Sequence, residues 1–121
     1  MTRVLYVDDE PDLREVAVFA LSLDRELEVR SAASGAEALS IVEEWRPDLV
    51  LLDVMMPGMD GPSTLSLLRK ETRHADLPVV FITARVQPKD KEDLVRLGAR
   101  AVIDKPFDPA TLAQIVRSYM D

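Results

Sequence analysis

Polar residues whose side chains can bind metal ions and phosphate follow four short apolar segments of this sequence. The polar residues are Asp8-Asp9, Asp53, Thr83 and Lys105, and the apolar segments that lead to them are Val4–Val7, Leu49–Leu52, Val79–Ile82 and Ala101–Ile103. The carboxyl ends of neighbouring strands lie along one edge of a parallel α/β sheet, so residues far apart in the chain converge there. Three carboxylates, a hydroxyl and an ammonium at that edge would form a site for a divalent cation and a phosphoryl group.

Amphipathic stretches between these segments predict the helices that would position them. Apolar residues from Leu13 to Leu21 recur at the spacing of one helix face, and Pro11 fits the first turn of that helix. Ser34 and Glu37 have the spacing of a capping box at the start of a second helix, which Pro47 ends. Three further helices are expected: after Gly61-Pro62 to about Glu71–His74, from Pro88 to Leu97 with Gly98 as its cap, and from Asp108-Pro109 onward.

A fifth apolar segment, Leu27–Val29, completes a regular alternation of strands and helices. Strands such as Leu49–Leu52 are apolar on both faces, which is typical of a parallel sheet covered by helices on both sides. The expected fold class is therefore α/β, with a doubly wound, five-stranded parallel sheet in a flavodoxin-like three-layer sandwich. Strand orders 2-1-3-4-5 and 3-2-1-4-5 are the usual choices. The first brings Asp8 and Asp53 together, so the chemistry favours the order 2-1-3-4-5.

Composition and charge restrict the classes of function. The 121 residues fit one domain, residues 1–121, and their formal charge of −7 argues against direct binding to nucleic acid phosphates. No apolar run approaches the roughly 20 residues that span a bilayer, so no membrane insertion is expected. The sequence has no cysteine, which excludes disulfides and thiolate metal sites. A cytoplasmic protein is the default expectation.

The polar residues and the segments around them resemble the receiver domain of two-component response regulators over essentially the whole chain. The matching motifs are Asp8-Asp9, Asp53 with Met56-Pro57-Gly58-Met59-Asp60-Gly61, Thr83-Ala84, and Lys105-Pro106-Phe107. Each motif alone is a weak signal, but the four motifs in this order, at strand ends, are specific. No effector domain follows the last expected helix, so the chain is expected to be either a stand-alone regulator of the single-domain chemotaxis type or an excised receiver.

The resemblance implies a role for each polar residue. Asp53 would be the phosphoryl acceptor and would bind Mg²⁺ together with Asp9 and the backbone carbonyl of Met55. Asp8 would complete the metal site from the second coordination sphere. Lys105 would reach the phosphoryl group next to a Lys105–Pro106 peptide bond that the family places in the cis form. Thr83 would donate a hydrogen bond to a phosphoryl oxygen.

The resemblance also implies a signalling function. A histidine kinase or a histidine phosphotransfer protein would donate the phosphoryl group. The protein would catalyse only its own phosphorylation and dephosphorylation, and would not be an enzyme in the usual sense. The effect of phosphorylation would pass through the loop Ala84–Lys89 and the fourth helix and change binding to an unknown downstream protein. That helix has few apolar residues, which predicts weak packing and mobility.

Two positions depart from the family's pattern. Val102 stands in the fifth strand, where members often have an aromatic residue that swings inward on phosphorylation. Coupling from the threonine to an aromatic residue is therefore not expected in this chain. Arg100-Ala101 replaces the acidic pair of the DNA-binding members that form dimers through their fourth and fifth helices. This difference argues against a transcription factor.

Three alternatives remain beside this interpretation. A Mg²⁺-dependent phosphatase with an aspartyl-phosphate intermediate commonly has a second aspartate two residues after the nucleophile, where this sequence has Met55. A flavodoxin-like flavin carrier would need a phosphate loop rich in Ser, Thr and Gly after the first strand, and the loop here is acidic. The sequence also fits a receiver domain excised from a larger regulator or hybrid kinase.

Three further residues are expected to have no role in the chemistry. His74, the single histidine, stands in a polar segment and is expected at the surface. Trp45 and Tyr119 fall on apolar helix faces, so packing roles are expected for both.

Overall fold

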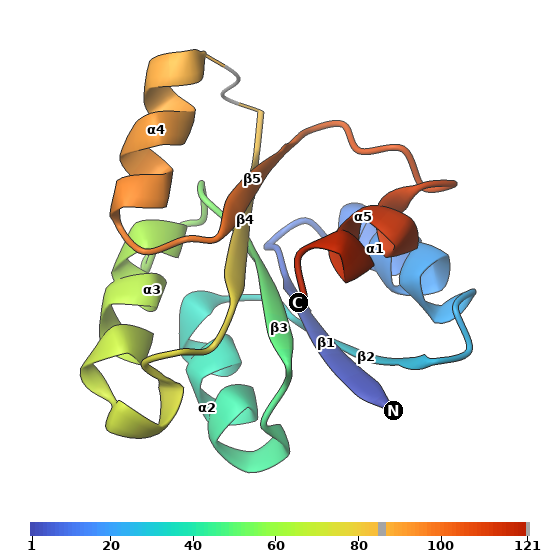
Figure 1. The fold of residues 1–121 in the computed structure, drawn as a ribbon, viewed down its shortest axis with the longest axis horizontal. Coiled ribbons are helices and arrows are strands. Elements are labelled where there is room, and N and C mark those ends of the chain that lie inside the picture. The colour runs from blue at the N-terminus through green and yellow to red at the C-terminus, as the bar shows by residue number, and fades with distance from the viewer. Residues whose placement is uncertain (85–86, 121) are drawn as a thin grey trace.

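The computed structural model describes residues 1–84 and 87–120, and it contains a five-stranded parallel sheet with helices on both faces (Figure 1). The strand order is β2-β1-β3-β4-β5, which confirms the predicted order 2-1-3-4-5. In chain order the elements are β1 (Thr2–Val7), α1 (Pro11–Ser22), β2 (Leu27–Ala32), α2 (Gly35–Trp45), β3 (Leu49–Asp53), α3 (Gly61–Lys70), the short 3₁₀ helix η1 (Thr72–His74), β4 (Val79–Thr83), α4 (Pro88–Arg96), β5 (Ala101–Asp104) and α5 (Leu112–Ser118).

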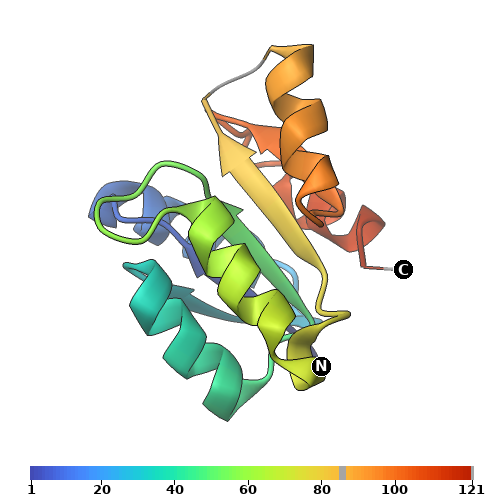
Figure 2. The same ribbon diagram turned by 90° about the vertical axis from the view of Figure 1, so that its left-hand side faces the viewer.

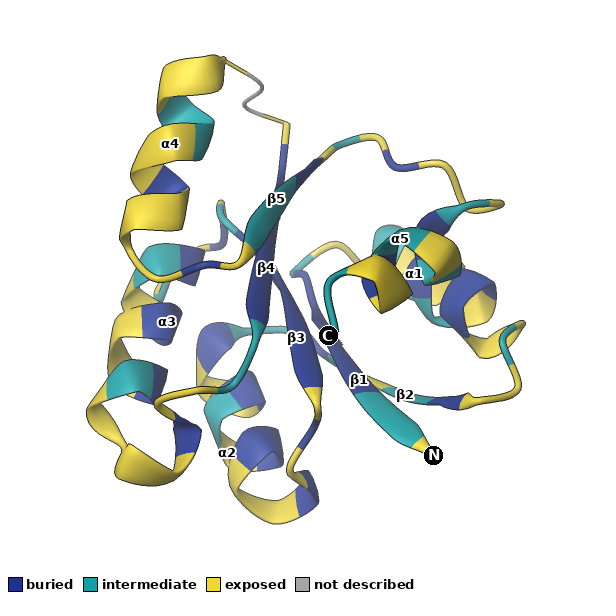
Figure 3. Cartoon of the chain, viewed as in Figure 1, coloured by how far each residue is buried: buried dark blue, intermediate teal, exposed yellow. Residues whose placement is uncertain are grey.

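Two apolar clusters, one on each face of the sheet, form the core. Figures 1 and 2 show α1 and α5 on one face, and α2, α3 and α4 on the other. Every residue of β3 and β4 is buried, as expected for central strands covered on both sides (Figure 3). The helices cover both faces of the sheet, so both faces are closed to water along these two strands.

Local capping explains where two of the helices begin. The Ser34 side chain accepts a hydrogen bond from the Glu37 N–H, and the Glu37 carboxylate accepts from the Ala33 N–H, which confirms the predicted capping interaction. Asp60 caps α3 in the same way, because its side chain accepts from the Ser63 N–H at 2.8 Å. The Asp60 cap fixes the start of α3 only eight residues after β3 ends.

The last helix begins later than predicted. Asp108-Pro109 was expected to open it, but α5 starts at Leu112. The Asp108 side chain accepts from the Ala110 N–H at 2.9 Å, and its carbonyl accepts from the Thr111 N–H at 3.1 Å. These bonds form a turn over residues 108–111, so Asp108 caps this turn and not the helix.

Helix α4 has little buried surface. Within α4, all of whose residues the structure describes, Leu94 is the one buried residue, in agreement with the thin packing predicted from its composition. Gly98 follows with φ +115°, a conformation that favours glycine at the end of a helix. The mobility of this helix stays a prediction, and the predicted loop Ala84–Lys89 includes Arg85 and Val86, which lie outside the described residues.

The expectation that His74 lies at the surface is wrong. His74 is only 7% exposed, and its Nε2 lies 3.1 Å from Oε2 of Glu43 on α2. The 3₁₀ turn η1 brings the ring to Glu43, whose carboxylate also pairs with the Arg73 guanidinium. Trp45 is buried, as predicted. Among the described residues, no helix is both long and apolar enough to cross a bilayer.

Candidate functional site

The predicted polar residues meet at the carboxyl edge of the sheet. Asp53 and Thr83 are the last residues of β3 and β4, whereas Asp8 and Lys105 directly follow β1 and β5. The Asp8 N–H donates to the carbonyl of Ala32 on β2, and the Lys105 N–H donates to the carbonyl of Thr83. These backbone bonds extend the sheet by one residue and hold both side chains at its edge.

Three carboxylates form an acidic cluster at this edge. One oxygen each from Asp8, Asp9 and Asp53 lies within 4.8 Å of the others. Asp8 and Asp53 are buried, and Asp9 is half-buried, so the cluster opens to solvent on the side of Asp9. An all-oxygen, carboxylate-rich set of donors fits Mg²⁺, which prefers hard ligands and keeps several waters. The residues present therefore fit the predicted metal.

Lys105 bridges the two buried carboxylates. Its Nζ lies 3.0 Å from Asp8 Oδ2 and 3.2 Å from Asp53 Oδ1, and its side chain is largely buried. Burial lowers the pKa of Lys105, but its hydrogen bond to Asp8 and the charges of Asp53 and Asp8 outweigh burial, so its pKa is raised. The ammonium is therefore charged, and it neutralises part of the acidic cluster.

Asp53 holds its negative charge less readily than an ordinary aspartate. Burial raises its pKa from 3.8 to about 6, and the neighbouring charge of Asp8 adds to this effect. Lys105 acts in the opposite direction through its charge and its hydrogen bond. A cation bound at the cluster would favour the ionised form of Asp53, which is the form that can act as a nucleophile.

Asp8 has partners that the sequence analysis missed. The Tyr6 hydroxyl donates to Asp8 Oδ2 at 2.9 Å, and the Glu10 N–H donates to Oδ1 at 3.0 Å. Burial, followed by the charge of Asp8, raises the pKa of Tyr6 well above its usual value, so the hydroxyl keeps its proton. The alternation of side chains along a strand places residues 6 and 8 on one face, and that spacing was the available signal.

A close backbone approach places the start of α3 beside Asp53. The Gly61 N–H donates to the Val54 carbonyl at 3.0 Å. A Cβ atom at Gly61 would lie 2.4 Å from the Asp53 carbonyl oxygen, which is closer than real Cβ contacts. Glycine is therefore required at position 61, at the end of the matched motif, for a packing reason.

The remaining predicted residues lie at the same edge. Thr83 is buried and is paired in register with Asp104 of β5. The Lys105–Pro106 peptide bond is cis, as the resemblance implied. Met55 follows Asp53 by two residues and is 59% exposed. Metal binding by the Met55 carbonyl stays a prediction.

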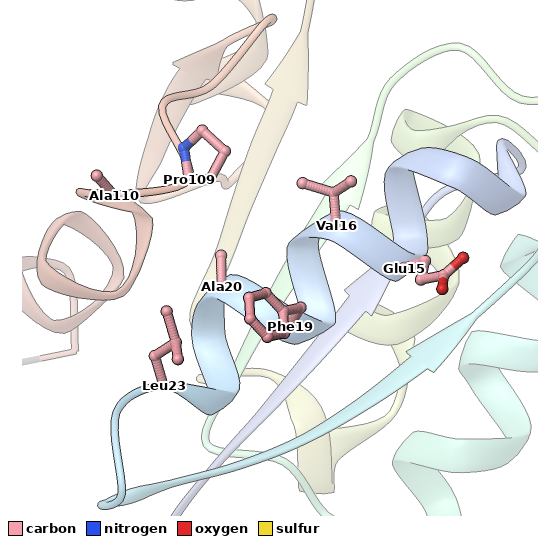
Figure 4. A pocket seen from close by; sticks show the side chains of 7 residues that line it. All are labelled: Glu15, Val16, Phe19, Ala20, Leu23, Pro109 and Ala110. Atoms are coloured by element: carbon pink, nitrogen blue, oxygen red, sulfur yellow. The ribbon is translucent and has the colours of Figure 1, made fainter.

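A separate apolar hollow lies on the outer side of α1 (Figure 4). It runs between α1 and the turn that precedes α5. Its lining residues are Glu15, Val16, Phe19, Ala20, Leu23, Pro109 and Ala110. None of the predicted site residues lines this hollow, so it is distinct from the acidic cluster.

The comparisons with known proteins agree with this geometry. A family model described as "Response regulator receiver domain" matches residues 4–117. Response regulator Rre1 of Synechocystis sp. is 40% identical over 117 residues, which are 97% of this chain and 51% of that protein. The phosphate regulon transcriptional regulatory protein PhoB of Klebsiella pneumoniae is 36% identical over 98% of this chain and 51% of its own length.

Solved structures show the same fold. The chemotaxis response regulator CheY4 of Vibrio cholerae matches with a TM-score of 0.90 and 32% identity over 98% of each chain. The chain thus spans about half the length of the two curated relatives, but nearly the whole of the CheY4 chain. Taken with the carboxylates and the lysine at the sheet edge, the match over residues 4–117 shows that this chain belongs to the response regulator receiver domain family.

Proposed function

We propose that this protein accepts a phosphoryl group on Asp53 from the phosphohistidine of a histidine kinase or histidine phosphotransfer protein, with Mg²⁺ bound at the acidic cluster. The observation that carries this proposal is the convergence of Asp8, Asp9 and Asp53 within 4.8 Å of one another, with Lys105 bridging the two buried members. A structural ion pair needs one acid for one base. The excess of two carboxylates suits a site that receives a cation.

The transfer needs positioning and charge neutralisation more than covalent chemistry. A carboxylate oxygen of Asp53 would attack the phosphorus atom and form the new O–P bond. The N–P bond of the phosphohistidine would break, and its electron pair would stay on the imidazole nitrogen. Lys105 would balance charge on the phosphoryl oxygens, because its ammonium already lies 3.2 Å from Asp53 Oδ1. Thr83 would donate its hydroxyl to a phosphoryl oxygen.

The metal would be held by Asp9, Asp53 and the Met55 carbonyl, with Asp8 in the second coordination sphere. Bound Mg²⁺ would withdraw charge from the phosphoryl oxygens. The three donors already on Asp8, from Tyr6, Glu10 and Lys105, support its place as an outer ligand. Hydrolysis of the acyl phosphate by water would return Asp53 to its carboxylate form, so the protein would act only on itself.

The output would pass through the loop after β4 and helix α4 to a partner protein. Lys91 on α4 pairs with Asp104 at the end of β5, with 2.9 Å between Nζ and Oδ1. Asp104 is the neighbour of Lys105 in sequence and of Thr83 in the sheet register. A shift of Thr83 or Lys105 toward a phosphoryl group would therefore act on a strand end that already contacts α4.

Intact mass after incubation with Mg²⁺ and phosphoramidate tests the proposal. Wild type should gain about 80 Da in a base-labile form. Asp53→Asn should gain nothing, and Asp93→Asn is the matched control because Asp93 is exposed on α4. A gain in Asp53→Asn equal to that in wild type would exclude Asp53 as the acceptor. Release of inorganic phosphate from added phosphomonoesters would instead favour the phosphatase alternative.

A second candidate is a receiver that forms part of a longer regulator of transcription. The 51% coverage of PhoB, which is described as a transcriptional regulatory protein, supports it. Arg100-Ala101, where the chain enters β5, argues against it, since the acidic pair of the dimer-forming DNA-binding members is absent there. Dimer formation on addition of beryllofluoride and Mg²⁺, measured by light scattering, would favour this candidate, and a monomer would favour the first.

A further inference from the structure

Asp8 is held in one orientation by donors from three parts of the chain. Its Oδ2 accepts from the Tyr6 hydroxyl at 2.9 Å and from Lys105 Nζ at 3.0 Å, and its Oδ1 accepts from the Glu10 N–H at 3.0 Å. Both Asp8 and Tyr6 have no exposed surface. Tyr6 is the neutral side-chain donor in this set, and it would contact neither the metal nor the phosphoryl group in the roles proposed above.

The ring of Tyr6 is fixed by packing, so its hydroxyl has a defined position. The ring belongs to the apolar cluster under α1 and α5. It lies edge-on to Phe107, with ring centroids 6.4 Å apart and an angle of 74° between the planes. Phe107 follows the Lys105–Pro106 segment directly. One side of this aromatic pair is therefore tied to β1, and the other to the segment that carries Lys105.

If the proposed phosphorylation takes place, the Lys105 ammonium would have to contact the phosphoryl group as well as the carboxylates. In the structure its ammonium is shared between Asp8 and Asp53. Contact with a phosphoryl group would draw the ammonium away from Asp8 and remove one donor from Oδ2. A buried carboxylate that loses a donor is costly unless another donor remains. The Tyr6 hydroxyl remains, because the packed ring holds it in place.

We propose that Tyr6 is a positioning residue that holds the Asp8 carboxylate in the orientation that the Mg²⁺ site requires, whether or not Lys105 is engaged elsewhere. This inference rests on the proposed function, because it assigns Asp8 to the metal site. Partners of metal-site carboxylates commonly change metal affinity 10–100-fold when they are removed. Since Tyr6 acts through Asp8, which is itself an outer ligand, we expect a smaller change of about three- to tenfold.

The variant Tyr6→Phe removes only the hydroxyl and keeps the ring that packs on Phe107. Mg²⁺ affinity is measured by following backbone amide shifts in a titration of the metal alone. We expect the Kd of Tyr6→Phe to be about three- to tenfold higher than that of wild type. Tyr119→Phe is the matched control, because it removes the second of the two tyrosine hydroxyls of the sequence. It should bind Mg²⁺ as wild type does.

A double-mutant cycle separates positioning from a general loss of stability. In an Asp8→Ala background, Tyr6→Phe should change the Kd by less than twofold, because the acceptor of the hydroxyl is already absent. Incorporation of 4-aminophenylalanine at position 6, which restores an N–H donor on the same ring, should bring the affinity back toward wild type. Loss of a purely structural hydroxyl would lower the free energy of unfolding and leave the Kd for Mg²⁺ unchanged.

Two results would overturn the inference. One is an unchanged Kd in Tyr6→Phe, and the other is an equal loss of affinity with and without the Asp8 carboxylate. Failure of the proposed function has a different signature, because wild type itself would then show neither Mg²⁺ binding nor the mass gain on phosphoramidate. The two failures are therefore distinguishable in one set of samples.

Discussion

Asp8, Asp53 and Lys105 depend on one another because all three are largely buried and only one of them is positive. Lys105 pairs with both carboxylates at 3.0 and 3.2 Å, and Asp9 adds a third acid beside them. Burial of a carboxylate without full neutralisation costs free energy. The cluster therefore destabilises the metal-free fold, and a bound cation would relieve this cost.

The raised pKa of Asp53 predicts that metal-free protein loses stability as the pH rises. Because the folded pKa is about 6 and the ordinary value is 3.8, the native state binds this proton more tightly than the unfolded chain does. The contribution is fully present below about pH 4 and is lost as the pH rises through 6. The stability lost between about pH 4 and neutral pH is on the order of 3 kcal/mol. Urea unfolding at several pH values measures it.

The control for this prediction is Asp53→Asn, which cannot titrate. The difference in unfolding free energy between the variant and wild type should grow from pH 4 to pH 7, with the variant the more stable at neutral pH. A difference that stays constant over this range would show that Asp53 titrates as in the unfolded chain.

Loss of the Lys105 ammonium should raise the pKa of Asp53 further. Lys105 lowers the pKa of Asp53 through its charge and hydrogen bond, so Lys105→Ala should raise that pKa above 6. Carboxyl ¹³C chemical shifts of Asp53 in a metal-free pH titration report it. Lys89→Ala, at an exposed lysine, is the control and should leave the titration unchanged. An unaltered Asp53 titration in Lys105→Ala would mean that the ammonium does not act on Asp53 in solution.

At the scale of elements, the site depends on how closely α3 follows β3. The Gly61 N–H bonds to the Val54 carbonyl, and Asp60 caps the helix at the same turn. The backbone around Asp53 is therefore held by the start of α3 as well as by the neighbouring strands.

Gly61→Ala tests this contact. Alanine is the better helix residue, but its Cβ would lie 2.4 Å from the Asp53 carbonyl oxygen and 3.0 Å from the Val54 Cα. The steric clash should outweigh helix propensity and destabilise the protein by about 1–3 kcal/mol in chemical denaturation. Ser63→Ala, at an exposed position in the same helical turn, should change stability by less than about 0.5 kcal/mol. Equal stability of Gly61→Ala and wild type would show that the backbone relaxes without cost.

Helix α4 is the element most easily displaced by events at the site, because Leu94 is its one buried residue along its described length. With beryllofluoride and Mg²⁺, hydrogen exchange should change in residues 87–97 and change little in β5 around Val102. The physical reason is the small packing energy that opposes a shift of α4. Exchange differences confined to β5 and α5 would place the moving element elsewhere.

At the scale of the whole molecule, the sheet separates two apolar clusters. A substitution in one cluster is therefore expected to disturb the packing on that face of the sheet. Phe81 of β4 is fully buried in the cluster under α2, α3 and α4. Phe19 of α1 is 66% exposed at the hollow in Figure 4. The two phenylalanines have the same side chain and differ in burial.

Phe81→Ala should destabilise the protein by about 3–5 kcal/mol, because it leaves a cavity against α3. Phe19→Ser should change the unfolding free energy by about 0.5 kcal/mol or less. Urea denaturation of both variants measures the contrast. A large loss in Phe19→Ser would reveal burial of α1 in solution, for example by self-association, and its dependence on protein concentration would identify that cause.

Much of the fold and of the candidate site could be predicted from the sequence, because the patterns that encode them are local. Apolar runs that end in Asp8, Asp53 and Thr83 encode strands whose polar ends gather at one edge of a parallel sheet. The requirement that Asp8 and Asp53 meet selects the strand order 2-1-3-4-5, and the structure has that order. The Ser34 cap depends on residues only three or four positions apart, so it too was predictable.

The tertiary structure decided what depends on contacts between distant segments. His74 is buried and its ring contacts Glu43, 31 residues earlier, and its polar neighbours in sequence gave no sign of this. Helix α5 starts at Leu112 and not at Asp108-Pro109 as predicted, because the Asp108 side chain accepts a hydrogen bond within a turn. Position 6 looked like an ordinary core position of a strand, and only packing showed that its hydroxyl reaches Asp8. Periodicity tells which face a side chain occupies, but its partner on that face depends on how the strands, turns and helices pack together.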